Sequence, residues 1–481
     1  MIIKSDKDII KCYFEDESGL RGGYADDAVF PESEEDAVNI LRDASDKKKP
    51  LTISGGGTGV TGARIPFGGT ILATDSFNKI INIDEKNMFA TLQPGVRLEA
   101  LQGELSKRGL IYPPDPTEPN SFIGGTISTN ASGAKGFRYG STRGYVKRLK
   151  VLLSTGDILS IIRGRHYINR ARPVLKLKNK EIKIKLPGYS IPDIKNAAGY
   201  YVKDNMDVID LFIGQEGTLG LILEADVAIA KSPEGVMTFF SFFLSEENAL
   251  AFIRDAKPNR PLSLEYMDGN SLKLLGTKHP NIPETAKAMV YFEQDYKKAD
   301  ENIVAESWFN LLEKHNALTE KSFFADSDKE IEKLKALRHA LPEMINEIVR
   351  RNKLPKVGTD IAVPEESFPE MLRFYKEKLS SSEIDFVIFG HIGENHLHVN
   401  MLPKREDEFI KSRSIYMDFV KKAISLKGTV SAEHGIGKLK HAFLEAMYGK
   451  KNLEEMAMLK KSLDPSCILG LDNIFPKELL R

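Results

Sequence analysis

Two short blocks in the last third of the chain hold four of its nine histidines and combine imidazole with carboxylate. They read GHIGENHLHVN at 390–400 and SAEHG at 431–435. Histidine nitrogens and carboxylate oxygens are donors that a borderline divalent metal such as zinc accepts. His396 and His398, two apart in an expected strand, face the same way, and His391 can curl back through Gly393. From the residues alone, a metal site and a set of ordinary core or surface side chains both stay open.

A glycine-rich stretch, SGGGTGVTGARIPFGG at 54–69, follows a short apolar run. Five of its first nine residues are glycine, so positive φ angles can turn several N–H groups into one concavity that suits a phosphate or pyrophosphate. It contains G-x-G-x-x-G, but Pro66 and Gly68-Gly69 prevent the helix that a Rossmann fingerprint requires. No Gly-Lys-Ser/Thr follows, which excludes a Walker loop. We predict a phosphate-cradling turn between strands, with a plain glycine-rich hairpin as the alternative.

A second stretch, YPPDPTEPNSFIGGTISTNASGAKGFRYGSTRG at 112–144, has four prolines, then Gly124-Gly125 and small polar residues. Such residues let a large planar ligand lie against the backbone. Together with the glycine-rich loop and FIGQEGTLG at 212–220, this stretch resembles the flavin-binding domain of the vanillyl-alcohol oxidase and p-cresol methylhydroxylase superfamily. More closely, the chain is similar to the D-2-hydroxyacid dehydrogenases of D-lactate, glycolate and D-2-hydroxyglutarate. The two histidine blocks extend the match over most of the chain.

The resemblance implies an α+β fold in three parts. A two-part FAD-binding domain of the p-cresol methylhydroxylase type is expected over residues 1–232, and a ferredoxin-like α+β substrate (cap) domain over 233–427. A helical C-terminal segment, 428–481, would return to the FAD domain. No His or Cys stands at an attachment place in the glycine-rich loop, so we expect FAD to be bound non-covalently. The residues expected to contact FAD are Gly55, Gly56, Gly57, Thr58, Gly59, Pro114, Gly124, Gly125, Thr126, Thr129, Ser132, Gly133, Tyr139, Glu216, Gly217, Gly220 and Ile222.

The same resemblance assigns roles to the histidine blocks. The metal, most simply Zn²⁺, would be bound by His391, His398 and Glu433, and His434 would be the catalytic base. A metal that holds the substrate hydroxyl stabilises the alkoxide, a histidine near neutral pKa accepts the proton, and the flavin takes the hydride. The carboxylate of the substrate would be bound by Arg338 and Lys356, with Asn400 as a polar contact.

The chain departs from the family pattern at several places. His396 is an extra imidazole, which either packs and bonds behind the metal ligands or contacts the substrate. Pro342 replaces a small hydroxylic residue one turn after Arg338, which leaves the distal substrate contacts open. Gln215 replaces serine, and GLDN at 470–473 replaces an Asn-Pro-Gly-Lys pattern that touches flavin.

Composition sets further bounds. Lys+Arg and Asp+Glu both number 68, so the net charge of zero gives no argument for nucleic-acid binding. The two cysteines, Cys12 and Cys467, support no disulfide framework and fit a reducing compartment. The start lacks a signal-peptide pattern, and no apolar run reaches the ~18–20 residues of a membrane span. We expect a cytoplasmic protein, with peripheral membrane contact left open.

Periodicity places the main elements. Helices are expected near 33–47, 98–107, 246–254, 302–315, 329–351, 367–379, 439–448 and 452–462, and strands near 70–74, 89–92, 151–154, 236–243, 263–266, 288–292, 386–389 and 397–402. Between Arg163 and Lys185 nine basic residues face Glu181 alone, and VLKLKNKEIKIK reads as a hairpin. Its lysines either protect an edge from aggregation or form a docking surface for an acidic protein or an anionic membrane.

The function expected is oxidation of a D-2-hydroxy acid by an FAD-dependent, metal-assisted dehydrogenase. Its partners would be the acid and an unidentified electron acceptor, such as an electron-transfer protein, a quinone or a cytochrome, and a homodimer is left open. The alternatives are an oxidase using dioxygen, a redox-neutral flavoenzyme resembling alkylglycerone-phosphate synthase, the flavin subunit of an electron-transfer complex, and a metallohydrolase without flavin.

Overall fold

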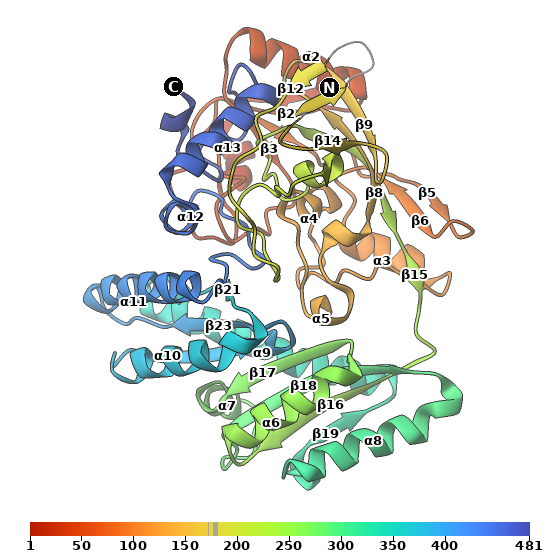
Figure 1. The fold of residues 1–481 in the computed structure, drawn as a ribbon, viewed down its shortest axis with the longest axis vertical. Coiled ribbons are helices and arrows are strands. Elements are labelled where there is room, and N and C mark those ends of the chain that lie inside the picture. Colours follow the sequence, from red (N-terminus) through yellow and green to blue (C-terminus); the bar gives the residue numbers. More distant parts are fainter. Residues whose placement is uncertain (172, 177–180) are drawn as a thin grey trace. The chain divides into compact units, whose positions relative to one another are not determined.

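The computed structural model describes residues 1–171, 173–176 and 181–481, which form two compact units (Figure 1). Unit 1 comprises Met1–Ser132, Ser141–Lys231 and Ser431–Arg481, and unit 2 comprises Gly133–Gly140 and Ser232–Val430. The polypeptide therefore crosses from one unit to the other four times, and its two ends belong to the same unit.

Unit 1 contains two main sheets. Its first half contains β1 Ile2–Lys4, α1 Lys7–Ile10, β2 Asp27–Phe30, α2 Glu34–Asp46, β3 Leu51–Ser54, β4 Thr70–Ala73, β5 Ile80–Asp84, β6 Phe89–Leu92, α3 Leu98–Ser106, β7 Leu110–Ile111 and α4 Ile123–Thr129. Its second half contains β8 Val146–Leu152, β9 Ile158–Ile162, β10 Tyr167–Ile168, β11 Val174–Lys176, β12 Glu181–Lys183, β13 Met206–Asp207, β14 Leu221–Ala228, β15 Ala230–Lys231, α12 His441–Tyr448 and α13 Lys450–Leu463.

The first sheet has the order β1-β2-β4-β3, with β4 parallel to both of its neighbours. Helix α2 makes the connection from β2 to β3 and begins at a capping box in which the Ser33 and Asp36 side chains bond each other's backbone N–H. Its buried residues Ala37, Leu41 and Ala44 share a hydrophobic cluster with residues of both main sheets. The second sheet, β5-β6-β14-β8-β9, is antiparallel throughout.

The C-terminal segment completes the core of unit 1. The N–H of Leu51 donates to the carbonyl of Ile468 at 2.8 Å, and the N–H of Gly470 donates to the carbonyl of Leu51 at 3.0 Å. Leu469 is fully buried in the cluster that also holds Leu51. On α13, the buried Lys460 amine donates to the Thr218 and Leu469 carbonyls and to Asp464. The first sheet thus depends on residues that follow it by more than 390 positions in the sequence.

Unit 2 is built on one sheet with the order β19-β16-β18-β17-β22-β23-β20, with β21 paired to β23. Its elements are α5 Gly136–Tyr139, β16 Gly235–Phe243, α6 Glu246–Ala256, β17 Ser263–Asp268, α7 Gly269–Gly276, β18 Ala288–Tyr296, α8 Glu301–Lys314, β19 Phe323–Ala325, α9 Asp328–Asn352, β20 Val357–Gly358, β21 Ile361–Ala362, α10 Phe368–Ser380, β22 Phe386–Gly390, β23 His396–Met401 and α11 Glu406–Ser425.

Strand β16 is apolar because helices cover both faces of the sheet (Figure 1). Phe240 and Phe242 pack in the cluster formed with α7 and α9. Phe239 points the other way, where it stacks on Phe292 with ring centroids 4.5 Å apart and meets Trp308 of α8. Alternate side chains of one strand therefore enter two separate cores.

The α+β class expected from the sequence is confirmed, and most expected elements are present within a few residues. The basic hairpin is confirmed as the antiparallel pair β11–β12, with Val174 opposite Lys183. Its connecting residues 177–180 lie outside the described part of the chain. The glycine-rich stretch joins β3 to β4 without an intervening helix, as predicted.

Candidate functional site

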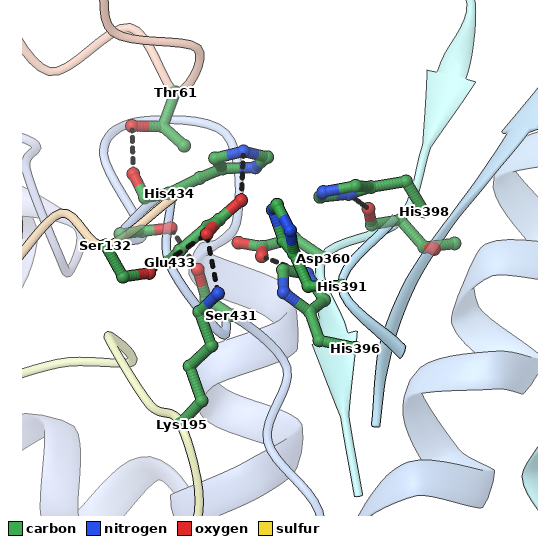
Figure 2. A network of polar contacts seen from close by, with 12 residues as sticks. Thr61, Ser132, Lys195, Asp360, His391, His396, His398, Ser431, Glu433 and His434 are labelled. Carbon is green, nitrogen blue, oxygen red and sulfur yellow. Dashed lines mark hydrogen bonds and ion pairs between the residues drawn. The ribbon is translucent and has the colours of Figure 1, made fainter. Parts of the chain in front are cut away.

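Three histidines of unit 2 gather where β22 ends and β23 begins (Figure 2). His391 follows Gly390, whose φ of +132° turns the chain out of β22, and His396 and His398 project from one face of β23. The ring centroids of His396 and His398 are 4.5 Å apart, and that of His391 lies 5.4 and 5.6 Å from them. One candidate ligand nitrogen from each ring lies within 4.8 Å of the others. The predicted convergence of these residues is therefore present.

Each of the three rings has an oxygen atom of another segment of unit 2 beside one of its nitrogens. Nδ1 of His391 lies 2.6 Å from Oε1 of Glu265, and Nδ1 of His398 lies 3.0 Å from the Thr359 carbonyl. Because a carbonyl only accepts, Nδ1 of His398 carries the proton and Nε2 carries the lone pair of the neutral ring. Nε2 of His396 lies 3.2 Å from Oδ1 of Asp360. Contacts of this kind fix the orientation of metal-binding imidazoles in proteins.

Arg338, which was predicted to bind a carboxylate, extends from α9 to the same Glu265. Nη2 of Arg338 donates to Oε2 of Glu265 at 3.0 Å, and the guanidinium lies over the ring of Tyr291. Burial by itself would raise the pKa of Glu265, but the neighbouring His391 and Arg338 outweigh burial and hold that pKa well below its usual value. The carboxylate of Glu265 therefore stays ionised and links the arginine to the histidine cluster.

The two other predicted substrate contacts lie near the end of the sheet. Asn400 is buried on β23 and is paired with Gly358 of β20, two residues after Lys356. Lys356 is exposed on the loop before β20. Among the described residues, no hydrogen bond or ion pair joins Lys356 to Arg338 or Asn400.

In unit 1, Glu433 is held by two side chains on one of its oxygens (Figure 2). Its Oε2 lies 2.8 Å from Nζ of Lys195 and accepts a hydrogen bond of 3.0 Å from Oγ of Ser132. Oε1 lies 3.6 Å from Nε2 of His434, whose side chain is 32% exposed. Ser132 was predicted to contact FAD, and in this structure its hydroxyl is bonded to Glu433. Both of these contacts are on Oε2, and Oε1 is the oxygen that lies next to His434.

The loop that carries His434 is anchored by Glu216. This buried carboxylate accepts from the N–H groups of Ile436 at 2.8 Å and Gly437 at 2.6 Å. Burial raises the pKa of Glu216 to about 7, although the two N–H groups oppose the shift. Glu216 was predicted to bind FAD, and the structure adds that it positions the segment next to the predicted base.

The glycine-rich loop has the features of an anion cradle. Among the described residues, none of the backbone N–H groups of residues 56–61 donates to a protein acceptor. A Cβ at Gly57, where φ is +81°, would overlap the guanidinium of Arg64. Arg64 donates from Nη1 to the Gly55 carbonyl and from Nη2 to the Cys12 carbonyl, while its buried Nε has no hydrogen-bond partner. Backbone N–H groups that are available as donors, next to the guanidinium of Arg64, suit the phosphate groups of FAD.

The other residues predicted to bind FAD fall in both units. Thr126 and Thr129 use their hydroxyls within α4, on the carbonyls of Ile123 and Gly125. Those in unit 1 lie on or beside α4 (Gly124, Gly125, Thr126, Thr129), in the turn before β14 (Gly217, Gly220), on β14 (Ile222), in the glycine-rich loop (Gly55, Gly56, Thr58, Gly59) and at Pro114. Gly133 and Tyr139 belong to the short piece of unit 2 that contains α5.

Sequence reasoning missed Glu265, Asp360, Lys195 and Arg64. Only Glu265 carried a usable signal, because it is a lone charge in the apolar strand sequence LEYM. The partners of Asp360 and Lys195 lie far away in the sequence, so their role follows from the fold alone, whereas Arg64 lies in the glycine-rich stretch itself, nine residues after Gly55.

Two family profiles match the chain. Residues 25–161 match the FAD binding domain, and residues 232–471 match the C-terminal domain of FAD linked oxidases. Among the described residues, none of the helices has the length and apolar character needed to cross a membrane.

Curated proteins of similar sequence cover nearly the whole chain. The chain is 30% identical to the "Glycolate oxidase subunit GlcD" of Bacillus subtilis, over 94% of this chain and 89% of that protein. It is 29% identical to a D-2-hydroxyglutarate dehydrogenase of Stutzerimonas stutzeri, over 93% and 90% of the two chains. It is 28% identical to a D-lactate dehydrogenase of Anaerostipes hadrus, over 91% and 87%.

Solved structures share the fold at lower identity. A 4-ethylphenol oxidase from Gulosibacter chungangensis has a TM-score of 0.71 at 16% identity, over 100% of this chain and 95% of that one. An alkyldihydroxyacetonephosphate synthase has a TM-score of 0.68 at 17% identity, over 97% and 83%. These two enzymes show the architecture alone. The assignment therefore rests on the family profiles and the sequence relatives. The chain belongs to the FAD-linked oxidases of the p-cresol methylhydroxylase and vanillyl-alcohol oxidase superfamily and is an oxidoreductase related to glycolate oxidase GlcD and to the D-lactate and D-2-hydroxyglutarate dehydrogenases.

Proposed function

We propose that this flavoprotein oxidises a D-2-hydroxy acid of the D-lactate, glycolate or D-2-hydroxyglutarate class to the 2-oxo acid, with a divalent metal and His434 as base. The observation that carries the proposal is the histidine cluster of unit 2, with Arg338 tied to it through Glu265. A metal-binding set of imidazoles next to a guanidinium suits a substrate that offers a hydroxyl and a carboxylate on adjacent carbons.

Glu433 is proposed as the carboxylate ligand that joins His391 and His398. Support comes from the path of the chain at the end of unit 2. Thr429 donates its N–H to the carbonyl of Ala362, and Ala362 is paired with His396 of β23. Glu433 follows Thr429 by four residues, which can span at most about 14 Å. The covalent chain therefore keeps Glu433 within reach of the histidine strand.

The proton of the substrate hydroxyl is proposed to pass to Nε2 of His434. That ring is partly exposed, and Glu433 beside it favours the imidazolium that forms. Glu216 holds the neighbouring backbone, so the imidazole is presented from a fixed loop. A bound divalent ion would lower the pKa of the hydroxyl, and bound FAD would supply the hydride acceptor.

The carboxylate of the substrate is proposed to contact Arg338 and Lys356, with Asn400 as a neutral donor. Nη2 of Arg338 donates to Glu265, and Nη1 lies 3.0 Å from Nε2 of His339. The guanidinium has five N–H groups, so those outside these two contacts can bind a second carboxylate. Lys356 is exposed on a loop and can approach a ligand without leaving a buried partner.

Anaerobic titration of the FAD-loaded protein tests the proposal. D and L forms of lactate and 2-hydroxyglutarate, and glycolate, are added in turn, and the absorbance of oxidised flavin is followed with and without a chelator. We expect bleaching by at least one D acid or glycolate, none by the matching L acid, and slower bleaching after chelation. Flavin that stays oxidised with every acid would overturn the assignment, and bleaching indifferent to the chelator would remove the metal from it.

A further inference from the structure

We propose that His396 is itself a metal ligand, so that unit 2 contributes three imidazoles rather than two. This inference rests on the proposed metal-assisted function and extends it to a residue that the family pattern does not include.

The geometry of β23 places His396 inside the cluster rather than behind it. Its ring lies closer to His398, at 4.5 Å between centroids, than His391 does, at 5.6 Å. One nitrogen of His396 lies within 4.8 Å of the candidate nitrogens of both other rings, a spacing that a single ion about 2.0–2.1 Å from each nitrogen can bridge after small rotations. The ring is fully buried, so it is held among these neighbours and away from bulk water.

His396 also has the partner expected of a ligand. Asp360 lies 3.2 Å from Nε2 of His396 and is itself 1% exposed. Glu265 lies in the same way beside His391, and the Thr359 carbonyl beside His398, where both contacts are hydrogen bonds. A carboxylate on one ring nitrogen makes the opposite nitrogen a more basic donor. For His396 that opposite nitrogen is Nδ1, whereas for His391 and His398 it is Nε2.

The backbone fixes this arrangement on two sides. Strand β21 pairs with β23, so that Ala362 is opposite His396, and this pairing brings Asp360, two residues earlier, to the ring. On the other side β22 pairs with β23, with Phe389 opposite His398. A third imidazole is therefore presented by a strand that is paired on both sides, and the buried side chain has little freedom to turn away.

Three imidazoles change which ions suit the site. With Glu433 they would fill the four positions of tetrahedral zinc and leave none for the substrate. An ion that accepts six ligands has two positions left for the hydroxyl and carboxylate oxygens of a 2-hydroxy acid. A nitrogen-rich set of this kind favours the later first-row ions, such as cobalt or nickel, over magnesium or calcium.

The test uses FAD-loaded protein stripped of metal and then loaded with Co²⁺. X-ray absorption at the cobalt edge counts the bound imidazoles, and we expect three in the unmodified protein and two in His396→Asn. Competition with a chelator should show a loss of roughly a hundredfold or more in Co²⁺ affinity, because even partners behind the ligands are worth 10–100-fold. His279→Asn, a histidine of unit 2 outside the cluster, is the matched control and should keep both values.

The outcomes separate this inference from the proposed function. Two imidazoles in the unmodified protein, or unchanged affinity in His396→Asn while His391→Asn and His398→Asn lose the metal, would overturn the role of His396 alone. Unchanged affinity in all three variants would overturn metal assistance itself. If His396→Asn does not fold, His396→Gln replaces it, and the imidazole count of the unmodified protein still decides the question.

Discussion

Oε1 of Glu265 lies 2.6 Å from Nδ1 of His391, and no local feature of the sequence joins these residues, which are 126 positions apart. Strand β17 pairs with β22, with Tyr266 opposite Gly390. Because Glu265 precedes Tyr266 and His391 follows Gly390, this pairing brings the two side chains together. The other oxygen of Glu265 accepts from Arg338. One buried carboxylate thus aligns a proposed metal ligand and a proposed substrate contact.

Glu265→Gln is expected to weaken metal binding by roughly 10–100-fold, because the amide is a poorer acceptor and no longer raises the basicity of His391. It should also raise KM for the hydroxy acid, since Arg338 loses its ionic partner. Chelator competition and steady-state kinetics measure the two effects. Glu347→Gln, at an exposed residue of α9, is the control, and equal metal affinity in both variants would contradict the role of Glu265.

Glu433→Ala and His434→Ala should separate metal binding from proton transfer. Loss of the carboxylate should lower metal content while FAD is retained, whereas loss of the imidazole should abolish flavin reduction while both metal and FAD remain. Metal analysis, the flavin spectrum and anaerobic reduction by the active acid are measured on each. Unchanged metal content in Glu433→Ala would contradict its ligand role.

Arg64→Met is expected to weaken FAD binding by about tenfold, since it removes a cation beside the unpaired N–H groups of the glycine-rich loop while keeping much of the side-chain volume. The measurement is the dissociation constant of FAD for the apoprotein, followed by flavin fluorescence. Arg21→Met, at a side chain that is 79% exposed, should bind as the unmodified protein does. Equal affinities in both variants would mean that Arg64 faces away from the cofactor.

Glu216→Gln should flatten the dependence of stability on pH. The pKa of Glu216 is about 7 in the folded protein and 4.5 without the fold, so the folded state binds the proton more tightly. Its stabilising contribution is complete below pH 4.5 and is lost as the pH rises through 7, by about 3 kcal/mol in all. Thermal midpoints between pH 5 and 8 should fall for the unmodified protein more than for the variant. Parallel curves would show that the carboxylate is ionised at little cost.

Much of the fold could be predicted because local signals and long-range packing agree. Helix α2 starts where Ser33 and Asp36 form a capping box, and the apolar run of β16 reflects two covered faces. Helix α9 continues through Pro342, as predicted, although proline removes one internal hydrogen bond. Such elements are specified by residues within a few positions of each other.

The site could be predicted only in part, because several of its contacts join residues that are far apart in the sequence. The spacing of His396 and His398 sets them on one face of a strand, and that prediction is confirmed. Asp360 and Glu265 reach the cluster through strand pairings that leave no periodic trace in the sequence. Lys195 contacts Glu433 across more than 200 residues of chain, so its place followed from the fold alone.

The hydrogen bonds between Leu51 and residues 468–470 have a consequence for the order of folding during translation. When the ribosome has added residue 430 it has made all of unit 2, yet unit 1 still lacks the final strand-like segment and the helices that close its core. We expect the inserted unit to fold first and unit 1 to fold only after residues 468–470 have been made. Flavin loading would then be a late step, and a protein truncated before residue 468 would emerge without a place to hold it.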